Sequence, residues 1–172
     1  MDRARAAVMG VSSRPLRNLI AMRPLLSLLL ALSLAPARGQ GHPVRWSFMA
    51  EQDTSGAPVV ALHANCDEGW HYYALTLPRE DGPFPTVIHL APSAAYQAAG
   101  PVVEPLPVEV EDPNFMMMVR YHGDGTVFRL PLKRLSNEAF NVEGGVEFMC
   151  CNDQMCLPPT TVKFNVPFPA VK

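Results

Sequence analysis

The chain has 172 residues, of which 48% are hydrophobic and 17% are charged, and its formal net charge is −2. A chain of this length suits one domain with a sizeable core. No cluster of lysine or arginine stands out, which argues against a nucleic-acid-binding surface. There is also no phosphate-binding loop and no readable serine–histidine–aspartate grouping, so nucleotide-dependent and hydrolase functions have no support.

The N-terminus has the pattern of a secretory signal peptide. Arg23 precedes an apolar run at 25–34, and the run is followed by Ala-Pro-Ala at 35–37. A positive region, a hydrophobic region of about ten residues and a small-residue cleavage site define such a peptide. The run is shorter than the about 20 residues that span a bilayer. We therefore predict that residues 1–37 are a signal peptide and that the rest is soluble and exported.

Translation could start at Met22 as well as at Met1. Met22 gives a more ordinary signal peptide than Met1, which leaves open whether residues 1–21 are a start-site artefact. Residues 38–43 are predicted to be a disordered lead-in. Because residues 1–37 hold five arginines and one aspartate, the remainder carries a net charge near −6. An exported protein meets compartments in which disulfides form and persist.

Short segments of alternating apolar and polar residues follow one another from residue 44 onward. Turn signals separate them, and no long segment has the helical period of 3.6 residues. This pattern predicts an all-β sandwich, one domain over 44–168 with a tail at 169–172. Residues 104–112 mix prolines with acidic residues and are not among the predicted strands. The predicted strands are 44–50, 59–66, 70–77, 86–90, 96–103, 119–121, 126–132, 140–151 and 160–168.

Three of the four cysteines fall in the stretch CCNDQMCLPP at 150–159. Predicted strands lie on either side of it, and the polar residues 152–154 fit a connection that reverses the chain. If the strands pair, Cys151 and Cys156 lie near opposite ends of that connection. Their Cα atoms could then approach within the about 4.4–6.8 Å that a disulfide requires. This pair is the candidate for the chemistry.

The residues alone leave the role of this bridge open. Four cysteines allow three complete pairings, and one bridge with two unpaired thiols is at least as consistent with the sequence as two bridges. As a structural staple, a six-residue loop contributes only about 2 kcal/mol. A bridge exposed at a connection would instead be labile and redox-active. The stretch is not a thioredoxin motif, because it has no C-x-x-C and no helix begins at the cysteines.

The stretch at 151–159 resembles the signature of the N-terminal domain of the thiol:disulfide interchange protein DsbD. The resemblance implies an immunoglobulin-like β-sandwich that acts as a periplasmic thiol–disulfide oxidoreductase of the protein-disulfide reductase type. Such a domain relays two electrons to oxidised partner proteins. Further similar segments occur in family order over most of 44–168: DEGWHYY at 67–73, GPFPT at 82–86, DPNF at 112–115, and Tyr121.

The resemblance also assigns roles to residues. Cys156 matches the cysteine that forms mixed disulfides with partners, and Cys151 matches the cysteine that resolves them. The family covers its cysteines with a mobile cap loop, which corresponds here to about 112–117. Phe115 is then the candidate shield, although ordinary core or edge packing remains the alternative for it and for 116–118. The cap residues on this reading are Asp112, Asn114, Phe115 and Met116.

Residues of one predicted strand are expected to line the same site. His71 and Tyr73 share a face because alternate residues of a strand point the same way. Trp70 and Tyr72 would then point into the core.

The chain has two further thiols. Cys150 is an extra thiol beside the candidate pair, and it either competes for Cys156 or lies buried on the opposite face of the strand. Burial as an inert side chain is the favoured interpretation. Cys66 occupies an apolar position of a predicted strand and is expected to be buried as a small hydrophobe.

The expected partners follow from the same resemblance. The sequence contains no polytopic membrane segment and no thioredoxin-like C-terminal domain. We therefore expect a membrane electron donor of the DsbD or CcdA type acting in trans. The expected clients are periplasmic thioredoxin-like or disulfide-containing proteins. We expect a monomer with no cofactor, no metal and no nucleic-acid partner.

Two other classes of function remain as alternatives. One is a non-catalytic binding module with a structural disulfide. The other is a Cu(I)-binding protein, because thiolate and thioether ligands favour Cu(I). Against copper, no M-x-x-M array is present, and methionines commonly fill gaps in cores. The sulfur-containing residues concerned are Cys150, Cys151, Cys156, Met149, Met155 and Met116–Met118.

Overall fold

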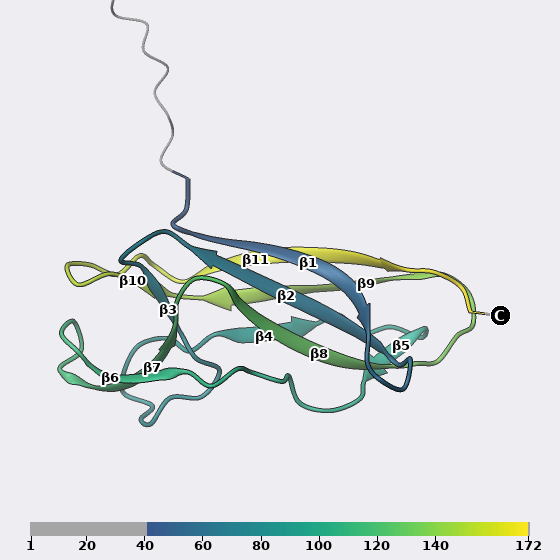
Figure 1. Cartoon of the computed structure of the whole chain (residues 1–172), viewed down its shortest axis with the longest axis horizontal. Helices are drawn as coiled ribbons and strands as arrows, with labels where there is room; N and C mark the ends of the chain where they lie inside the picture. Colours follow the sequence, from purple (N-terminus) through teal and green to yellow (C-terminus); the bar gives the residue numbers. More distant parts are fainter. Residues whose placement is uncertain (1–40, 172) are drawn as a thin grey trace, which may run out of the picture. The chain divides into compact units, whose positions relative to one another are not determined.

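The computed structural model describes residues 41–171, which fold into antiparallel strands joined by turns and loops (Figure 1). No helix in this range is long and apolar enough to cross a membrane. The predicted signal peptide and the first part of the predicted lead-in lie outside the described residues. The strands are β1 (Val44–Gln52), β2 (Pro58–Cys66), β3 (His71–Tyr73), β4 (Val87–Leu90), β5 (Tyr96–Ala98), β6 (Val108–Asp112), β7 (Met117–His122), β8 (Thr126–Arg134), β9 (Phe140–Phe148), β10 (Cys150–Cys151) and β11 (Thr160–Phe168).

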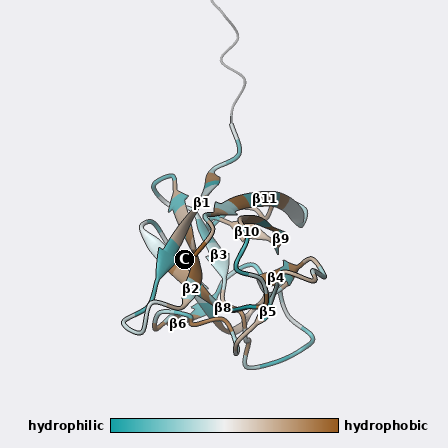
Figure 2. Cartoon of the chain, turned by 90° about the vertical axis from the view of Figure 1, so that its right-hand side faces the viewer, coloured by the Kyte–Doolittle hydropathy of each residue, from teal (hydrophilic) through white to brown (hydrophobic). Residues whose placement is uncertain are grey.

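Three antiparallel sheets make up an immunoglobulin-like β-sandwich. Their strand orders are β1-β2-β8-β5, β11-β9-β4 and β10-β3-β7-β6. The last, whose four strands have two to six residues each, is the small sheet. The main core holds side chains from β1, β2 and β8 together with side chains from β9 and β11. Viewed end-on, these two groups of strands enclose it (Figure 2). The predicted all-β sandwich is confirmed.

Alternating side chains explain why the strands pack as they do. On β11, Phe164, Val166 and Phe168 are buried, whereas Lys163 and Asn165 between them are exposed. Residues of one strand face point the same way, so β11 covers the core with every second side chain. Each such apolar side chain stabilises the fold by about 1.5–3 kcal/mol when fully buried.

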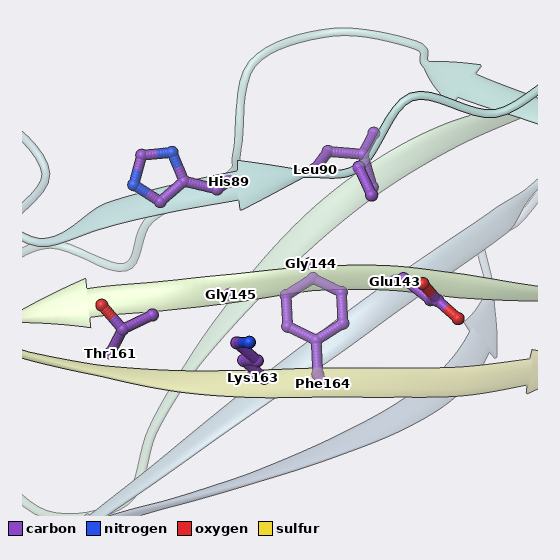
Figure 3. Close-up of a pocket in the computed structure, with 9 residues that line it drawn as sticks. His89, Leu90, Glu143, Gly144, Gly145, Thr161, Lys163 and Phe164 are labelled. Atoms are coloured by element: carbon purple, nitrogen blue, oxygen red, sulfur yellow. The ribbon is translucent and has the colours of Figure 1, made fainter.

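A close approach of β9 and β11 requires a glycine. Gly144 lies opposite Phe164 in the register of the two strands. A Cβ atom at Gly144 would lie 2.3 Å from Cζ of Phe164 and 2.2 Å from the carbonyl oxygen of His89. Figure 3 shows the Phe164 ring standing over this part of β9, beside a surface groove between β4 and β11. Any larger residue at this position would displace the ring or the neighbouring strand β4.

Three predicted strands are wrong in extent. The segment 140–151 is not one strand but two, β9 and β10, which belong to different sheets. The segment 70–77 is a strand only over His71–Tyr73. Ala74 leaves the ladder after one bond from its N–H to the Arg120 carbonyl, and its own carbonyl accepts from Thr86. The segment 96–103 is a strand only over Tyr96–Ala98, followed by one bridge from Val103 to β8.

One strand was not among the predictions. β6 (Val108–Asp112) pairs with β7 on one side only, so it is an edge strand of its sheet. Its first four residues are exposed, and charged and apolar side chains alternate among them. Charged residues are typical of edge strands because they discourage pairing with other chains. The acidic residues of this segment, which argued against a strand, are therefore typical of a strand at the edge of a sheet.

Candidate functional site

The structure joins Cys151 and Cys156 in a disulfide, with their Cα atoms 4.0 Å apart. Cys151 belongs to β10, where it lies opposite His71 of β3. The intervening loop is closed by bonds from the N–H of Asn152 to the Met155 carbonyl and from the N–H of Leu157 to the Cys150 carbonyl. The Asn152 side-chain oxygen also accepts from the backbone of the next turn residues, which is the local bonding that favours asparagine in turns.

The expectation that this bridge is exposed is wrong. Cys151 is fully buried and Cys156 is half-buried. The pair lies in a small apolar cluster of its own, separate from the main core, because the β6–β7 hairpin packs over it. Of the two sulfur-bearing residues, Cys156 is the one nearer to solvent. The cluster contains Tyr73, Val119 and Cys151, with Leu77, Phe115, Met117, Tyr121, Met149 and Cys156 packed against them.

Tyr73 connects the bridge to a buried carboxyl group. Its hydroxyl lies 2.7 Å from Oδ2 of Asp112 and 3.1 Å from Sγ of Cys151. The side chains of all three residues are buried. Burial first, and then the hydrogen bond to Asp112, raise the pKa of Tyr73 well above its ordinary value. The hydroxyl therefore keeps its proton at any physiological pH.

The segment expected to be a cap loop is a tight hairpin turn. Asp112 is not in the loop but is the last residue of β6, and Met117 begins β7. The turn between them is held by bonds from the N–H groups of Asn114 and Met116 to Asp112, at 2.7 and 2.8 Å. Met116 has φ of 54°, a left-handed conformation that is uncommon for residues other than glycine. The structure therefore places the expected cap residues together, in a shorter loop than the sequence suggested.

This turn contacts both sides of the disulfide region. Phe115 packs edge-on against Tyr73, with ring centroids 6.0 Å apart. The Asn114 side chain donates to the Asn152 carbonyl at 2.9 Å, which ties the turn to the loop between the cysteines. Met116, in contrast, is 79% exposed. Phe115 and Asn114 thus cover the bridge region, whereas Met116 points to solvent.

His71 faces the same carboxyl without binding it. Its Nε2 lies 3.8 Å from Oδ2 of Asp112 and makes no hydrogen bond. The ring stacks on Tyr121 at 4.5 Å between centroids. Burial lowers the pKa of His71, against the opposing attraction of Asp112 and Asp153. His71 is therefore neutral at neutral pH, and the structure brings it and Tyr73 to one site.

The two other cysteines do not take part in the bridge. Cys66 and Cys150 are both unpaired thiols buried in the main core. Burial raises the pKa of Cys150 to about 11 and, with the nearby Asp124 carboxyl, that of Cys66 to about 12. Both therefore stay protonated near neutral pH, where the thiolate is the reactive form. Sγ of Cys150 lies 3.8 Å from Nε2 of His42.

Sequence reasoning missed two features of this site. Tyr121 was noted only as part of the resemblance, and it forms one wall by stacking on His71. The hydrogen bond between Tyr73 and Asp112 joins residues 39 positions apart, which no local pattern reveals. Asp112 had been assigned to the cap loop, but it ends the edge strand β6 and its side chain is turned inward.

The arrangement around the bridge does not include a metal site among residues 41–171, where no three or more histidine, cysteine or acidic side chains are placed to hold an ion. Of the methionines named for the copper alternative, Met116, Met118 and Met155 are exposed. Met117 and Met149 pack in the small cluster with the two bridged cysteines. The groove in Figure 3 is lined by residues of β4, β9 and β11 and by none of the residues around the disulfide.

Two solved structures and one family model are similar to this chain. A crystal structure of the DsbD N-terminal domain of Neisseria meningitidis in the reduced form is 16% identical, with a TM-score of 0.49, over 74% of this chain and 87% of that one. The N-terminal periplasmic domain of ScsB from Proteus mirabilis is 19% identical, with a TM-score of 0.47, over 71% of this chain and 44% of that one. This chain thus spans less than half of the ScsB structure. No curated protein matched the sequence.

The family model described as thiol:disulfide interchange protein DsbD, N-terminal, matches residues 43–167, which is nearly the whole described part of the chain. This match covers the cysteine loop, the strand with Tyr73 and the β6–β7 turn together. The chain therefore belongs to the family of DsbD N-terminal domains, which are thiol–disulfide exchange domains.

Proposed function

We propose that this protein is a periplasmic relay that passes two electrons to oxidised partner proteins through the Cys151–Cys156 pair. The observation that carries the proposal is the disulfide between these two residues, set in its own cluster beneath the β6–β7 turn. A short loop closed by this bridge gives little stability to a domain with a large core. An accessible disulfide would be reduced by any thiol in its surroundings. A disulfide covered by a turn reacts only after the turn has been displaced.

The unequal burial of the two cysteines supports a division of labour. In the reduced protein, the thiolate of Cys156 attacks a sulfur of the partner's disulfide, and the partner's other sulfur leaves as a thiolate. The product is a mixed disulfide on Cys156. Cys151 then attacks the Cys156 sulfur, the Cys151–Cys156 bond forms, and the partner departs with both electrons. Cys156 suits the first step because it is half-buried, whereas Cys151 is inaccessible.

The turn at 113–116 would act as the gate for these steps. Phe115 packs on Tyr73, and Asn114 is bonded to the loop that contains Cys156. A docking partner that displaces this turn would expose the Cys156 sulfur without unfolding the sandwich. The β6–β7 hairpin belongs to the small sheet, so its movement leaves the main core intact.

The remaining parts of the proposal concern location and partners. The predicted signal peptide would export the protein to the periplasm, as the family assignment suggests. Its electron donor would be a membrane protein of the DsbD or CcdA type acting in trans, and its clients thioredoxin-like or other disulfide-containing proteins. The protein would work as a monomer without a cofactor.

Trapping of the mixed disulfide tests this division of labour. In Cys151→Ser, the resolving thiol is absent, so oxidised thioredoxin-like protein should accumulate as a covalent adduct on Cys156, visible by mass spectrometry. The matched variant Cys156→Ser keeps only the buried cysteine of the pair, Cys151, and should form little adduct. Equal adduct on both variants, or none on either, would contradict the proposed roles.

A structural role for the bridge is the second candidate, and the complete burial of Cys151 favours it. Under that reading, the disulfide would resist biological reductants, with a potential below about −300 mV. The two candidates therefore differ in a measurable redox potential.

A further inference from the structure

Two short contacts connect the sulfur of Cys151 with the carboxyl of Asp112. The Tyr73 hydroxyl lies between them, at 3.1 Å from the sulfur and 2.7 Å from the carboxyl oxygen. A tyrosine hydroxyl has one hydrogen to donate and lone pairs that accept. It can therefore donate to one neighbour while it accepts from the other, which gives a continuous path for a proton.

The path matters because exchange requires an anion at Cys151. A thiolate, not a thiol, attacks a disulfide, and a thiolate also leaves when the bridge is opened. Cys151 is fully buried, and the Asp112 side chain is 1% exposed. If the thiol lost its proton to solvent, this buried site would hold two negative charges separated by one hydroxyl group, which is strongly disfavoured.

Among residues 41–171, no ion pair with a lysine or arginine compensates a negative charge at this site. His71 faces Asp112 from β3, and burial lowers the pKa of His71, so it is neutral at neutral pH. Tyr121 packs on His71 from β7, and the nearest charge on the cysteine loop is the negative Asp153. If the thiol instead passes its proton to the Asp112 carboxylate, the negative charge moves from Asp112 to the sulfur, and the site still holds a single negative charge.

We propose that Tyr73 is a catalytic residue of the exchange reaction, carrying the proton between Cys151 and Asp112, and that Asp112 is the positioning residue that holds the hydroxyl and accepts the proton. This inference rests on the proposed function, because it assigns the proton path of the same disulfide.

The reaction balances in both directions. In the mixed disulfide, the Cys151 thiol gives its proton to Oη of Tyr73 while the hydroxyl proton passes to Asp112. The Cys151 sulfur attacks Sγ of Cys156, the new bond forms, and the partner's sulfur leaves with the electron pair of the broken bond. When a partner's thiolate instead attacks Cys156, Cys151 is the leaving group, and Asp112 returns the proton to it through Tyr73.

The two thiol–disulfide exchange steps can be followed separately with the chromogenic disulfide DTNB. Reduced full-length protein should release one thionitrobenzoate when Cys156 attacks the reagent and a second when Cys151 resolves the adduct. In Tyr73→Phe, the ring and its packing on Phe115 remain, but the hydroxyl is lost. We expect the second release to slow at least about tenfold, since a hydrogen bond to a charged group is lost, while the first release is unchanged.

The pH dependence of the second release shows whether the Tyr73 hydroxyl carries a proton or whether the side chain only packs against its neighbours. With the relay, the rate should change little between about pH 6 and 8, because Asp112 accepts the proton internally. In Tyr73→Phe and Asp112→Asn, the thiol must ionise to solvent, and the rate should rise about tenfold per pH unit below the ordinary thiol pKa of about 8.5. Tyr72→Phe is the matched control, because Tyr72 is the adjacent residue of β3 and packs in the main core instead; it should behave as wild type.

Each outcome decides between the alternatives. Should Tyr73→Phe retain the rate and the flat pH profile of wild type, the relay is refuted, although the release of two equivalents would still support the proposed function. If wild-type protein releases no second equivalent, the proposed function itself fails. The Tyr73→Phe result alone decides the inference if Asp112→Asn does not fold, as judged by its thermal unfolding.

Discussion

Truncation of Phe115 should open the bridge to small reductants. Phe115 packs on Tyr73 and belongs to the small cluster around the disulfide. An aromatic pair contributes about 0.5–1.5 kcal/mol beyond the area that it buries. Phe115 is only partly exposed, and exposing the rest of its side chain costs on the order of 1 kcal/mol, from about 1.5–3 kcal/mol for a fully buried phenylalanine. Phe115→Ala should thus lower the free energy of opening the turn by about 1.5–3 kcal/mol.

That change in free energy corresponds to a bridge that is reduced about 10- to 100-fold faster, provided that opening precedes the attack. The assay is the rate of reduction by dithiothreitol, followed by alkylation and mass spectrometry of the Cys156 peptide. The matched control is Met116→Ala in the same turn, because Met116 is 79% exposed and covers nothing. It should leave the rate unchanged. Equal rates in wild type and Phe115→Ala would refute the view that Phe115 shields the bridge.

Three further predictions concern the fold and its titratable groups. Gly144→Ala should lower the free energy of unfolding, measured in urea, by about 1–3 kcal/mol or more, because the added Cβ overlaps the Phe164 ring and a backbone oxygen. The control Gly123→Ala should leave the free energy of unfolding unchanged, because nothing lies within 4 Å of its added Cβ. Cys66 and Cys150 should resist iodoacetamide at about pH 8 in the folded protein and react once it is unfolded, because burial raises the pKa of both thiols. Because burial lowers the pKa of His71, the unfolded state binds a proton more readily than the folded state. The melting temperature should therefore fall as pH drops below about 6.5, and less so in His71→Gln.

The sandwich was predictable because its strands carry a local signal. In β11 (Thr160–Phe168), every second residue is exposed and those between are buried or partly buried, so its bounds were predicted correctly. β3 (His71–Tyr73) was predicted to be longer because its aromatic residues continue an apolar run, but the chain turns away after Tyr73 to bond with Thr86. Where a strand ends thus depends on partners that are distant in the sequence.

The sequence predicted which residues lie near the candidate site, but not how deeply the bridge is buried. Cys151 and Cys156 could be paired by their spacing, and His71 and Tyr73 by the alternation of side chains along a strand. Nothing local shows that Asp112 ends an edge strand with its side chain turned inward, since the two acidic residues before it, Glu109 and Glu111, have exposed side chains. The burial of the bridge follows from the β6–β7 hairpin, which is a long-range arrangement.

The measurement that tests the account most directly is the redox equilibrium of the protein in glutathione buffers, with mass spectrometry to locate the bridge. A relay predicts a bridge between Cys151 and Cys156 that titrates between about −180 and −270 mV, the range of exchange proteins. A bridge that stays closed well below about −300 mV, or one that includes Cys66 in solution, would contradict the account and leave a structural module.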